Sequence, residues 1–310
     1  MKYAIIADIH GNSHALMAVL EDIRKEYVDG YLCVGDYFGD FPYPNEVTDA
    51  IKSLKECHII SGNKEGYLID LHASNRTEWV YDQFNALYWN YNELRDDNMD
   101  FLLNLPDKKL IEVEGERKVL LLRSITSIFE GTNLDLLTSS RYAKRMEEAP
   151  FTNQDYSEYI KNLLSDDIKL QEELEKIDAD IIVFGHSHVQ WHVAINDKLL
   201  INAGSCGLPL DYRSSAAYTI LDIKEDSVFV EERRVQYDKC NLIEECKKSG
   251  LYEYAKYWCD ITIDELTSAR DDISFFFEHA WEIARKHQNE KWPLDNSIWE
   301  EAGKSWFEGR

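Results

Sequence analysis

The sequence has few basic side chains for its length. Lysine and arginine total 34 residues against 58 aspartates and glutamates, which gives a formal net charge of -24. A surface of this kind repels the phosphate backbone of nucleic acids and anionic membranes. We therefore expect neither a long nucleic acid nor a membrane as partner. Small anions remain compatible with the composition, because bound divalent ions can invert the field locally.

Paired cysteines and long hydrophobic runs are also missing. The six cysteines are scattered without a CxxC pair, which excludes a zinc ribbon and a disulfide framework. No apolar run approaches the roughly 20 residues that span a bilayer, and no signal-peptide pattern opens the chain. We therefore expect a cytoplasmic protein. Its 310 residues, 44% of them hydrophobic, suffice for one large domain or for one domain with an appendage.

The first 65 residues alternate between short apolar runs and segments with helical spacing. The helical segment that starts at Ser13 has Asn12 or Ser13 placed to cap it. Each apolar run ends in polar residues, and these runs cover residues 3–7, 30–34 and 58–60. Three successive strand–helix units predict an α/β sheet whose polar residues gather at one edge.

The rest of the chain continues this pattern less regularly. We expect a helical, aromatic segment over 77–103 and a hairpin around Gly115. Over 124–150 we expect a long loop with short helical pieces. An amphipathic helix is predicted over 155–177. Further strands are predicted over 180–184, 191–195, 198–201, 218–223 and 227–233, with a tight turn at 202–207.

The last 70 residues change character and predict a helical appendage. Thr262-Ile263-Asp264-Glu265 has the form of a capping box, which predicts that a helix starts there. Apolar residues from Leu266 to Ile283 continue on one helical face. We therefore divide the chain into a domain over 1–239 and a helical extension over 240–310. This extension packs on the core or on a partner.

Metal-type ligands follow four of the predicted strands. The motifs are Asp8-x-His10, Gly35-Asp36, Gly62-Asn63 and Gly185-His186-x-His188. In an extended strand, residues two apart point the same way, so Asp8 and His10 can converge on one ion. Alone, this pair is better explained as ordinary turn residues that cap a strand. Together, the carboxylates, imidazoles and amide oxygen suit Mn, Fe or Zn.

With these motifs, the sequence from Met1 to about Tyr237 resembles the calcineurin-like metallophosphoesterase superfamily. Within it, the small prokaryotic YfcE-like branch is the most similar. The segments 41–47 and 202–207, which follow the second and fourth motifs, support the resemblance. The fold implied is a four-layer α/β/β/α sandwich with two mixed β-sheets, here followed by the C-terminal helical appendage.

The resemblance also implies a role for each candidate ligand. Asp8, His10 and His188 would hold a first metal, Asp36 would bridge two ions, and Asn63 and His186 would serve the second. One or two divalent ions would activate a water for attack on a small phosphate mono- or diester, such as a nucleotide. Asp36, Asn63 and His186 would thus act in catalysis.

Two positions depart from the family pattern. Arg123 stands where a second-metal histidine is usual, and a guanidinium cannot ligate. Lys64 follows Gly62-Asn63 where a histidine is frequent. One hypothesis is that both are catalytic and bind phosphate, with Arg123 replacing a weakened second metal and activity reduced. The other is that both only pair with carboxylates such as Glu65. Tyr37 is a further candidate substrate contact, by stacking on an aromatic group.

A second function class remains open from the sequence. The chain would then be a catalytically weakened member that binds metal or phosphate and acts as a regulatory or interaction module. The C-terminal helices would contact a partner or a second copy of the chain. A protein serine/threonine phosphatase fits less well, because Tyr37-Phe38-Gly39 replaces the usual Asp-Arg-Gly.

Overall fold

Two five-stranded β-sheets pack face to face in the computed structural model, which describes residues 1–123 and 129–308. The first sheet has the order β10 (Ser227–Val235), β9 (Ala216–Lys224), β1 (Lys2–Ile6), β2 (Gly30–Val34) and β3 (Cys57–Ile60). The second has the order β4 (Lys108–Glu112), β5 (Lys118–Leu122), β6 (Ile181–Phe184), β8 (Lys198–Ala203) and β7 (Gln190–Ile195). Each sheet combines parallel and antiparallel pairs, so both are mixed, as predicted.

The alternation of side chains along β1 shows how the layers are built. Tyr3 and Ile5 point into the core between the sheets, whereas Ala4 and Ile6 face the helices outside. This alternation follows from the two-residue period of a strand. Because both faces are buried, β1 reads as a continuous apolar run.

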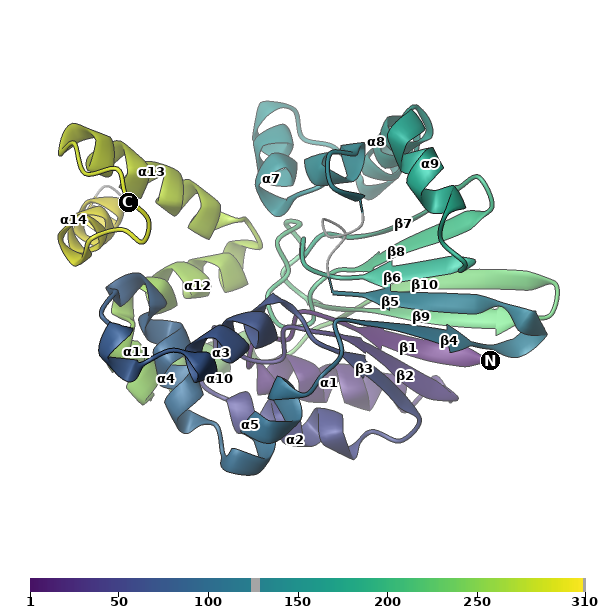
Figure 1. Cartoon of the computed structure of the whole chain (residues 1–310), viewed down its shortest axis with the longest axis horizontal. Coiled ribbons are helices and arrows are strands. Elements are labelled where there is room, and N and C mark those ends of the chain that lie inside the picture. The colour runs from purple at the N-terminus through teal and green to yellow at the C-terminus, as the bar shows by residue number, and fades with distance from the viewer. Residues whose placement is uncertain (124–128, 309–310) are drawn as a thin grey trace.

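Helices cover the outer face of each sheet (Figure 1). Those on the first sheet are α1 (Ser13–Ile23), α2 (Pro44–Ser53), α3 (Asn63–Ala73), α4 (Asn85–Glu93) and α5 (Asp96–Leu103). Those on the second are α7 (Ser139–Glu148), α8 (Asn153–Ser165) and α9 (Ile168–Glu175). The predicted four-layer α/β/β/α sandwich is thus confirmed. The Asn12 side chain caps α1 by accepting the Ala15 N–H at 2.9 Å.

Three predicted segments differ in detail. The helix expected over 155–177 is interrupted, because Asp167 caps α9 by accepting the Leu170 N–H. The segment 77–103 contains the 3₁₀ helices η1 (Arg76–Glu78) and η2 (Asp82–Phe84) besides α4 and α5. The loop expected over 124–150 begins at residues 124–128, which lie outside the described part. It then contains η4 (Asn133–Leu136), a short helical piece as expected, and α7, which is longer at 10 residues. The hairpin at Gly115 is confirmed, with η3 (Glu114–Glu116) between β4 and β5.

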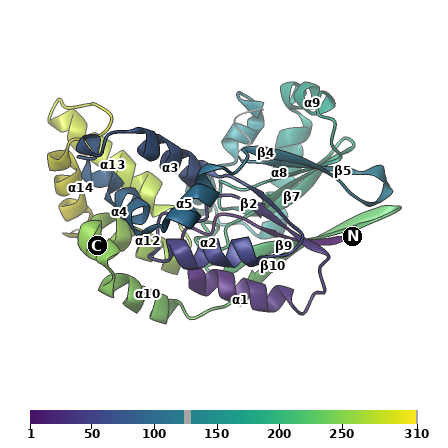
Figure 2. The ribbon, with the colours of Figure 1, turned by 60° about the horizontal axis from the view of Figure 1, so that its bottom comes forward.

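The C-terminal region is helical and packs on the sandwich. Its helices are α10 (Lys239–Lys248), α11 (Gly250–Tyr254), α12 (Lys256–Ser268), α13 (Asp272–Lys286) and α14 (Asn296–Glu308). Leu242 and Leu266 share an apolar cluster with Phe41 and Leu210 of the sandwich. Figure 2 shows α10 beside α1 and the remaining helices at one end of the molecule. The domain boundary at residue 239 stays a prediction.

The predicted capping box in this region is wrong. Residues 262–265 lie inside α12, and the chain turns only at Ala269, which has a left-handed φ of 55°. The next helix is capped instead by Asp271, whose carboxylate accepts the Ser274 N–H. The apolar face expected to run from 266 to 283 is therefore divided between two helices.

No helix among the described residues is long and apolar enough to cross a bilayer. The expected cytoplasmic location stays a prediction.

Candidate metal centre

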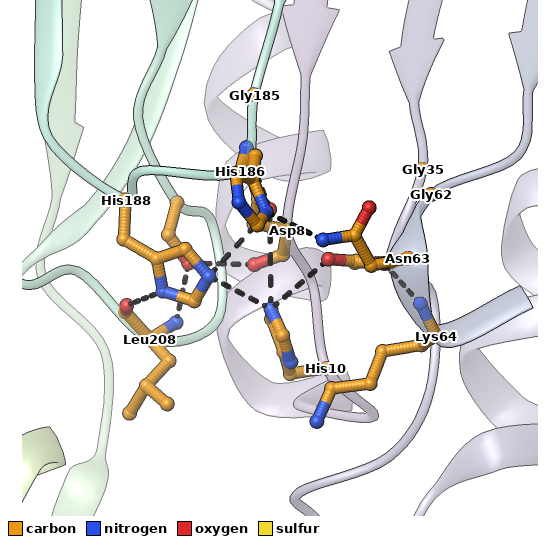
Figure 3. A network of polar contacts seen from close by, with 12 residues as sticks. Asp8, His10, Gly35, Gly62, Asn63, Lys64, Gly185, His186, His188 and Leu208 are labelled. Atoms are coloured by element: carbon orange, nitrogen blue, oxygen red, sulfur yellow. Dashed lines mark hydrogen bonds and ion pairs between the residues drawn. The ribbon is translucent and has the colours of Figure 1, made fainter. Parts of the chain in front are cut away.

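The segments that directly follow β1, β2, β3 and β6 meet at one edge of the sandwich and carry all six predicted ligands. Figure 3 shows Asp8, His10, Asn63, His186 and His188 among them. We expected Asp8 and His10 to share one face of an extended strand, and this is wrong, because β1 ends at Ile6. Five of the six ligand residues instead have a positive φ: Asp8 52°, His10 57°, Asp36 54°, His186 76° and His188 56°. This conformation costs a residue other than glycine about 1–3 kcal/mol. Such strain is concentrated at functional sites.

Asp8, His10 and His188 converge on one point. Oδ1 of Asp8 lies 3.5 Å from Nε2 of His188 and 4.0 Å from Nε2 of His10. The two Nε2 atoms are 3.0 Å apart. All three residues are buried, and within residues 1–123 and 129–308 no other set of three or more His, Cys, Asp or Glu side chains gathers its ligand atoms within 4.8 Å.

The hydrogen bonds made by Nδ1 of each histidine determine the protonation state of the Nε2 atoms that face this point. Nδ1 of His188 lies 2.6 Å from the Leu208 carbonyl oxygen, which can only accept, so Nδ1 carries the proton. Nδ1 of His10 donates in the same way to the Asp40 carboxylate. Both Nε2 lone pairs therefore face the Asp8 carboxylate, an arrangement of three acceptors that fits a divalent cation.

The electrostatics of the cluster agree with this donor set. Burial and the neighbouring Asp36 carboxylate raise the pKa of Asp8 well above its ordinary value. Burial and the nearby His10 lower the pKa of His188 well below that of a free imidazole. A cation bound between them would favour the ionised carboxylate and the neutral imidazole, which are the ligand forms.

Asp36, Asn63 and His186 form the other half of the centre. Oδ2 of Asp36 lies 3.9 Å from Nε2 of His10, so this carboxylate borders the first cluster. Oδ1 of Asp36 accepts the backbone N–H of Lys64 at 2.6 Å. The Asn63 amide nitrogen lies 2.7 Å from Nδ1 of His186. The structure thus brings the second predicted ligand pair together at the rim.

Arg123 contacts this second half directly. Its Nε donates to Oδ1 of Asn63 and its Nη2 to the Asn63 carbonyl oxygen, both at 3.3 Å. Nη1 lies 3.4 Å from the Asp107 carboxylate. Gly66 provides the space, since a Cβ there would lie 1.9 Å from Nη2. The guanidinium therefore covers the amide oxygen that the family resemblance makes a metal ligand.

Lys64 lies between the metal cluster and the C-terminal helices. Its Nζ is 3.0 Å from Oδ1 of Asp40 and 5.4 Å from the Trp258 ring centroid. Trp258 Nε1 donates to the same carboxylate oxygen at 2.8 Å. Burial opposes the charge of both groups. For Lys64, the carboxylates of Asp40 and Asp36 outweigh burial and raise its pKa. For Asp40, the charges of Lys64 and His10 outweigh burial and hold its pKa well below the usual range. The pair is therefore ionic.

Glu65 holds two of the ligand loops together and was missed as a site residue. Its Oε2 accepts the N–H groups of Asp36 and Gly62 at 2.9 and 2.6 Å, and its Oε1 accepts that of Tyr37 at 3.0 Å. Burial and Asp36 raise the pKa of Glu65 to about 7. Lys64 and Arg123 do pair with carboxylates, as one hypothesis expected, but their partners are Asp40 and Asp107. Glu65 accepts three backbone N–H groups instead.

Tyr37 is not placed to contact a substrate, which corrects the sequence prediction. The side chain is fully buried, and its hydroxyl donates toward the carbonyl oxygens of Cys33 and Ile60 at 3.0 and 2.7 Å. The same hydroxyl accepts the Gly35 N–H at 3.1 Å. Through these three hydrogen bonds, the buried Tyr37 hydroxyl ties the Gly35-Asp36 loop to the ends of β2 and β3.

Asp40 and Trp258 were likewise missed from the sequence. A signal for Asp40 existed, since Gly39-Asp40 repeats the form of Gly35-Asp36 four residues later. Nothing local marks Trp258, which lies on α12 and meets Asp40 only in the folded chain.

Known proteins share this chain's sequence pattern and fold. Residues 1–190 match the family model of calcineurin-like phosphoesterases. An uncharacterized protein of Methanocaldococcus jannaschii is 28% identical over 271 residues, which cover 81% of this chain and 94% of that protein. The crystal structure of a metallophosphoesterase from Sphaerobacter thermophilus has a TM-score of 0.58 and 20% identity, covering 87% of this chain and 100% of that one. A hypothetical protein from Pyrococcus horikoshii has a TM-score of 0.60 and 21% identity, covering 84% and 97%.

Proposed function

Because this chain belongs to the calcineurin-like phosphoesterase family, we propose that it hydrolyses small phosphate mono- or diesters, nucleotides among them, with the aid of divalent metal ions. The observation that carries the proposal is the buried convergence of Asp8, His10 and His188. The imidazoles are oriented there by Asp40 and by the Leu208 carbonyl, so that their lone pairs face the carboxylate.

Each ligand has a place in this proposal. Asp8, His10 and His188 would hold a first ion, Asp36 would border both positions, and Asn63 with His186 would serve a second. Mn, Fe or Zn bound there would supply an acidified water and neutralise the charge that develops on the phosphate.

The chain's own cations would bind and orient the phosphate. Lys64 keeps its charge next to Asp40 and has further N–H donors beyond that contact. Arg123, partly exposed beside Asn63, presents a planar fork that matches phosphate oxygens. His186 is exposed at the rim of the centre, where a substrate reaches it.

The test is turnover of a generic aryl phosphodiester by the purified chain with added Mn²⁺. We expect hydrolysis that is lost after chelation and restored by the metal. A folded sample that turns over no phosphate ester with Mn²⁺, Fe²⁺ or Zn²⁺ would contradict the proposal. It would favour the second candidate, a metal- or phosphate-binding module.

One observation favours that second candidate or a single-metal enzyme. The guanidinium of Arg123 engages the Asn63 amide oxygen, which removes a ligand from the second metal position. We therefore propose that Arg123 replaces part of the charge of a second ion.

Replacing Arg123 with histidine tests this role. We expect Arg123→His to raise the bound metal from about one ion per chain toward two, because an imidazole can ligate and no longer covers Asn63. Metal counting by mass spectrometry measures it. Arg117→His, on the same hairpin but bonded to Glu225, is the matched control. If Arg123→His gains no metal, Arg123 does not occupy the ligand position.

A further inference from the structure

A cavity of about 630 Å³ lies beside the metal centre, between the sandwich and the C-terminal helices. One wall comes from α3 and the segment that leads into α4. The facing wall comes from α12, α13 and the connection between α13 and α14. Its volume falls in the range of small-molecule sites. Neither wall alone encloses the space, so the cavity exists only because the appendage docks here.

Aromatic rings dominate the lining. They include Trp79, Phe84 and Tyr88 from the first wall and Trp258, Phe277 and Trp292 from the second. Trp79 and Tyr88 already stack on each other, with centroids 5.1 Å apart and planes inclined by 6°. Trp292 is 58% exposed and lies in contact with Phe84 and Phe277. Aromatic side chains on both walls suit a planar aromatic ring, which stacks on them without requiring a particular hydrogen-bond pattern.

The polar groups of the cavity are distributed unevenly. Lys64 and Asp40 lie at the end nearest the metal centre, where Asp40 also contacts Nδ1 of His10. The exposed carboxylates of Asp70 and Glu78 contribute to the lining elsewhere. Lys64 pairs with Asp40 there, but its ammonium group has further N–H donors that a single phosphate can use at this end. Carboxylates away from it repel a second anion and accept hydrogen bonds from amino groups.

We propose that this cavity binds the planar aromatic part of the substrate, and that a nucleobase carried by one phosphate group is the class it selects. The phosphate then lies at Lys64, next to the metal centre, while the ring stacks among the tryptophans. This assignment rests on the proposed phosphoesterase function, whose substrate class it specifies.

The appendage then has a defined part in specificity. Trp258 of α12 lines the cavity and donates to Oδ1 of Asp40, the same oxygen that Lys64 contacts. This hydrogen bond connects the C-terminal wall of the cavity to Asp40, the carboxylate that orients His10. Residues beyond 240 thus contact both the substrate ring and the support of a metal ligand.

Isothermal titration calorimetry on the metal-free chain tests ring recognition separately from hydrolysis. The probes are adenosine 5′-monophosphate and ribose 5-phosphate, which differ only in the base. We expect the nucleotide to bind at least about tenfold more tightly, because base stacking on aromatic side chains adds affinity. Equal affinities would overturn the proposal.

Matched variants locate the effect in the cavity. Trp292→Ala and Trp79→Leu should each reduce nucleotide affinity about tenfold and leave ribose 5-phosphate binding unchanged. Phe229→Ala is the control, since Phe229 is 57% exposed on β10, outside the cavity. Circular dichroism establishes that each variant is folded. A nucleotide preference that survives in both folded cavity variants would overturn the proposal.

Turnover of the aryl phosphodiester separates the two proposals. Hydrolysis together with equal affinities for the two probes overturns the ring site and leaves the phosphoesterase function. A preference for the nucleotide, lost in Trp292→Ala, without any hydrolysis overturns the phosphoesterase function and supports ring recognition.

Discussion

Replacing Asp8 with asparagine is expected to lower phosphoesterase turnover by on the order of 10³-fold, because loss of one preorganised charge-stabilising group has about that effect. Asparagine keeps the size of the side chain but removes the negative charge that, with the two imidazoles, makes the donor set suit a cation. Metal affinity should fall in parallel. Kinetics with Mn²⁺ and metal titration measure the two losses.

The same substitution should leave the metal-free protein at least as stable as wild type. Burial and Asp36 raise the pKa of Asp8, which means that the fold disfavours this carboxylate when no cation balances it. Thermal unfolding in the presence of a chelator measures this effect. Asp166→Asn, at an exposed position at the end of α8, is the control for loss of one charge. A strongly destabilised metal-free Asp8→Asn chain would indicate a structural role instead.

Replacing Glu65 with alanine is expected to lower the free energy of unfolding by about 3–5 kcal/mol. Three backbone N–H groups would lose their acceptor in a buried site, and each unsatisfied donor costs roughly 1–3 kcal/mol before relaxation. Glu65→Gln retains one acceptor oxygen and should lose less, about 1–3 kcal/mol. Denaturant unfolding measures both changes. Glu21→Ala, exposed on α1, should change stability by less than about 0.5 kcal/mol.

The pH dependence of these variants has a defined sign. In the folded chain the pKa of Glu65 is raised from 4.5 to about 7, so the folded state binds this proton more tightly than the unfolded state. The stability that this proton contributes is complete below about pH 4.5 and is lost as pH rises through 7. In chelator, the free energy of unfolding of wild type should therefore fall relative to Glu65→Gln over that window, by up to about 3 kcal/mol. A constant difference would contradict the raised pKa.

Local sequence patterns predicted most of the strands and helices of the sandwich. Short apolar runs that end in polar residues predicted the parallel strands, since a strand buried on both faces must be apolar throughout. The family expected from the ordered motifs is confirmed by the match over residues 1–190. Helix ends in the C-terminal region were predicted less well. The capping-box pattern at 262–265 was overridden, because that segment packs within the longer helix α12.

The candidate site divides in a similar way. Asp8, His10 and His188 are marked by residue type and by their place after strands, so their convergence could be predicted. The predicted role of Tyr37 was wrong because its side chain is buried. Burial depends on residues that are distant in the sequence, so the neighbouring residues in the sequence do not reveal it.

For this protein, the sequence by itself determined the order of the strands, the four ligand motifs and their association with a phosphoesterase family. These depend on residue type and short spacing. The tertiary structure decided which atoms meet: Asp40 on His10, Arg123 on Asn63, and Trp258 on Asp40. Such contacts join residues up to 218 positions apart, and their energies depend on the burial and orientation that only the packed chain provides.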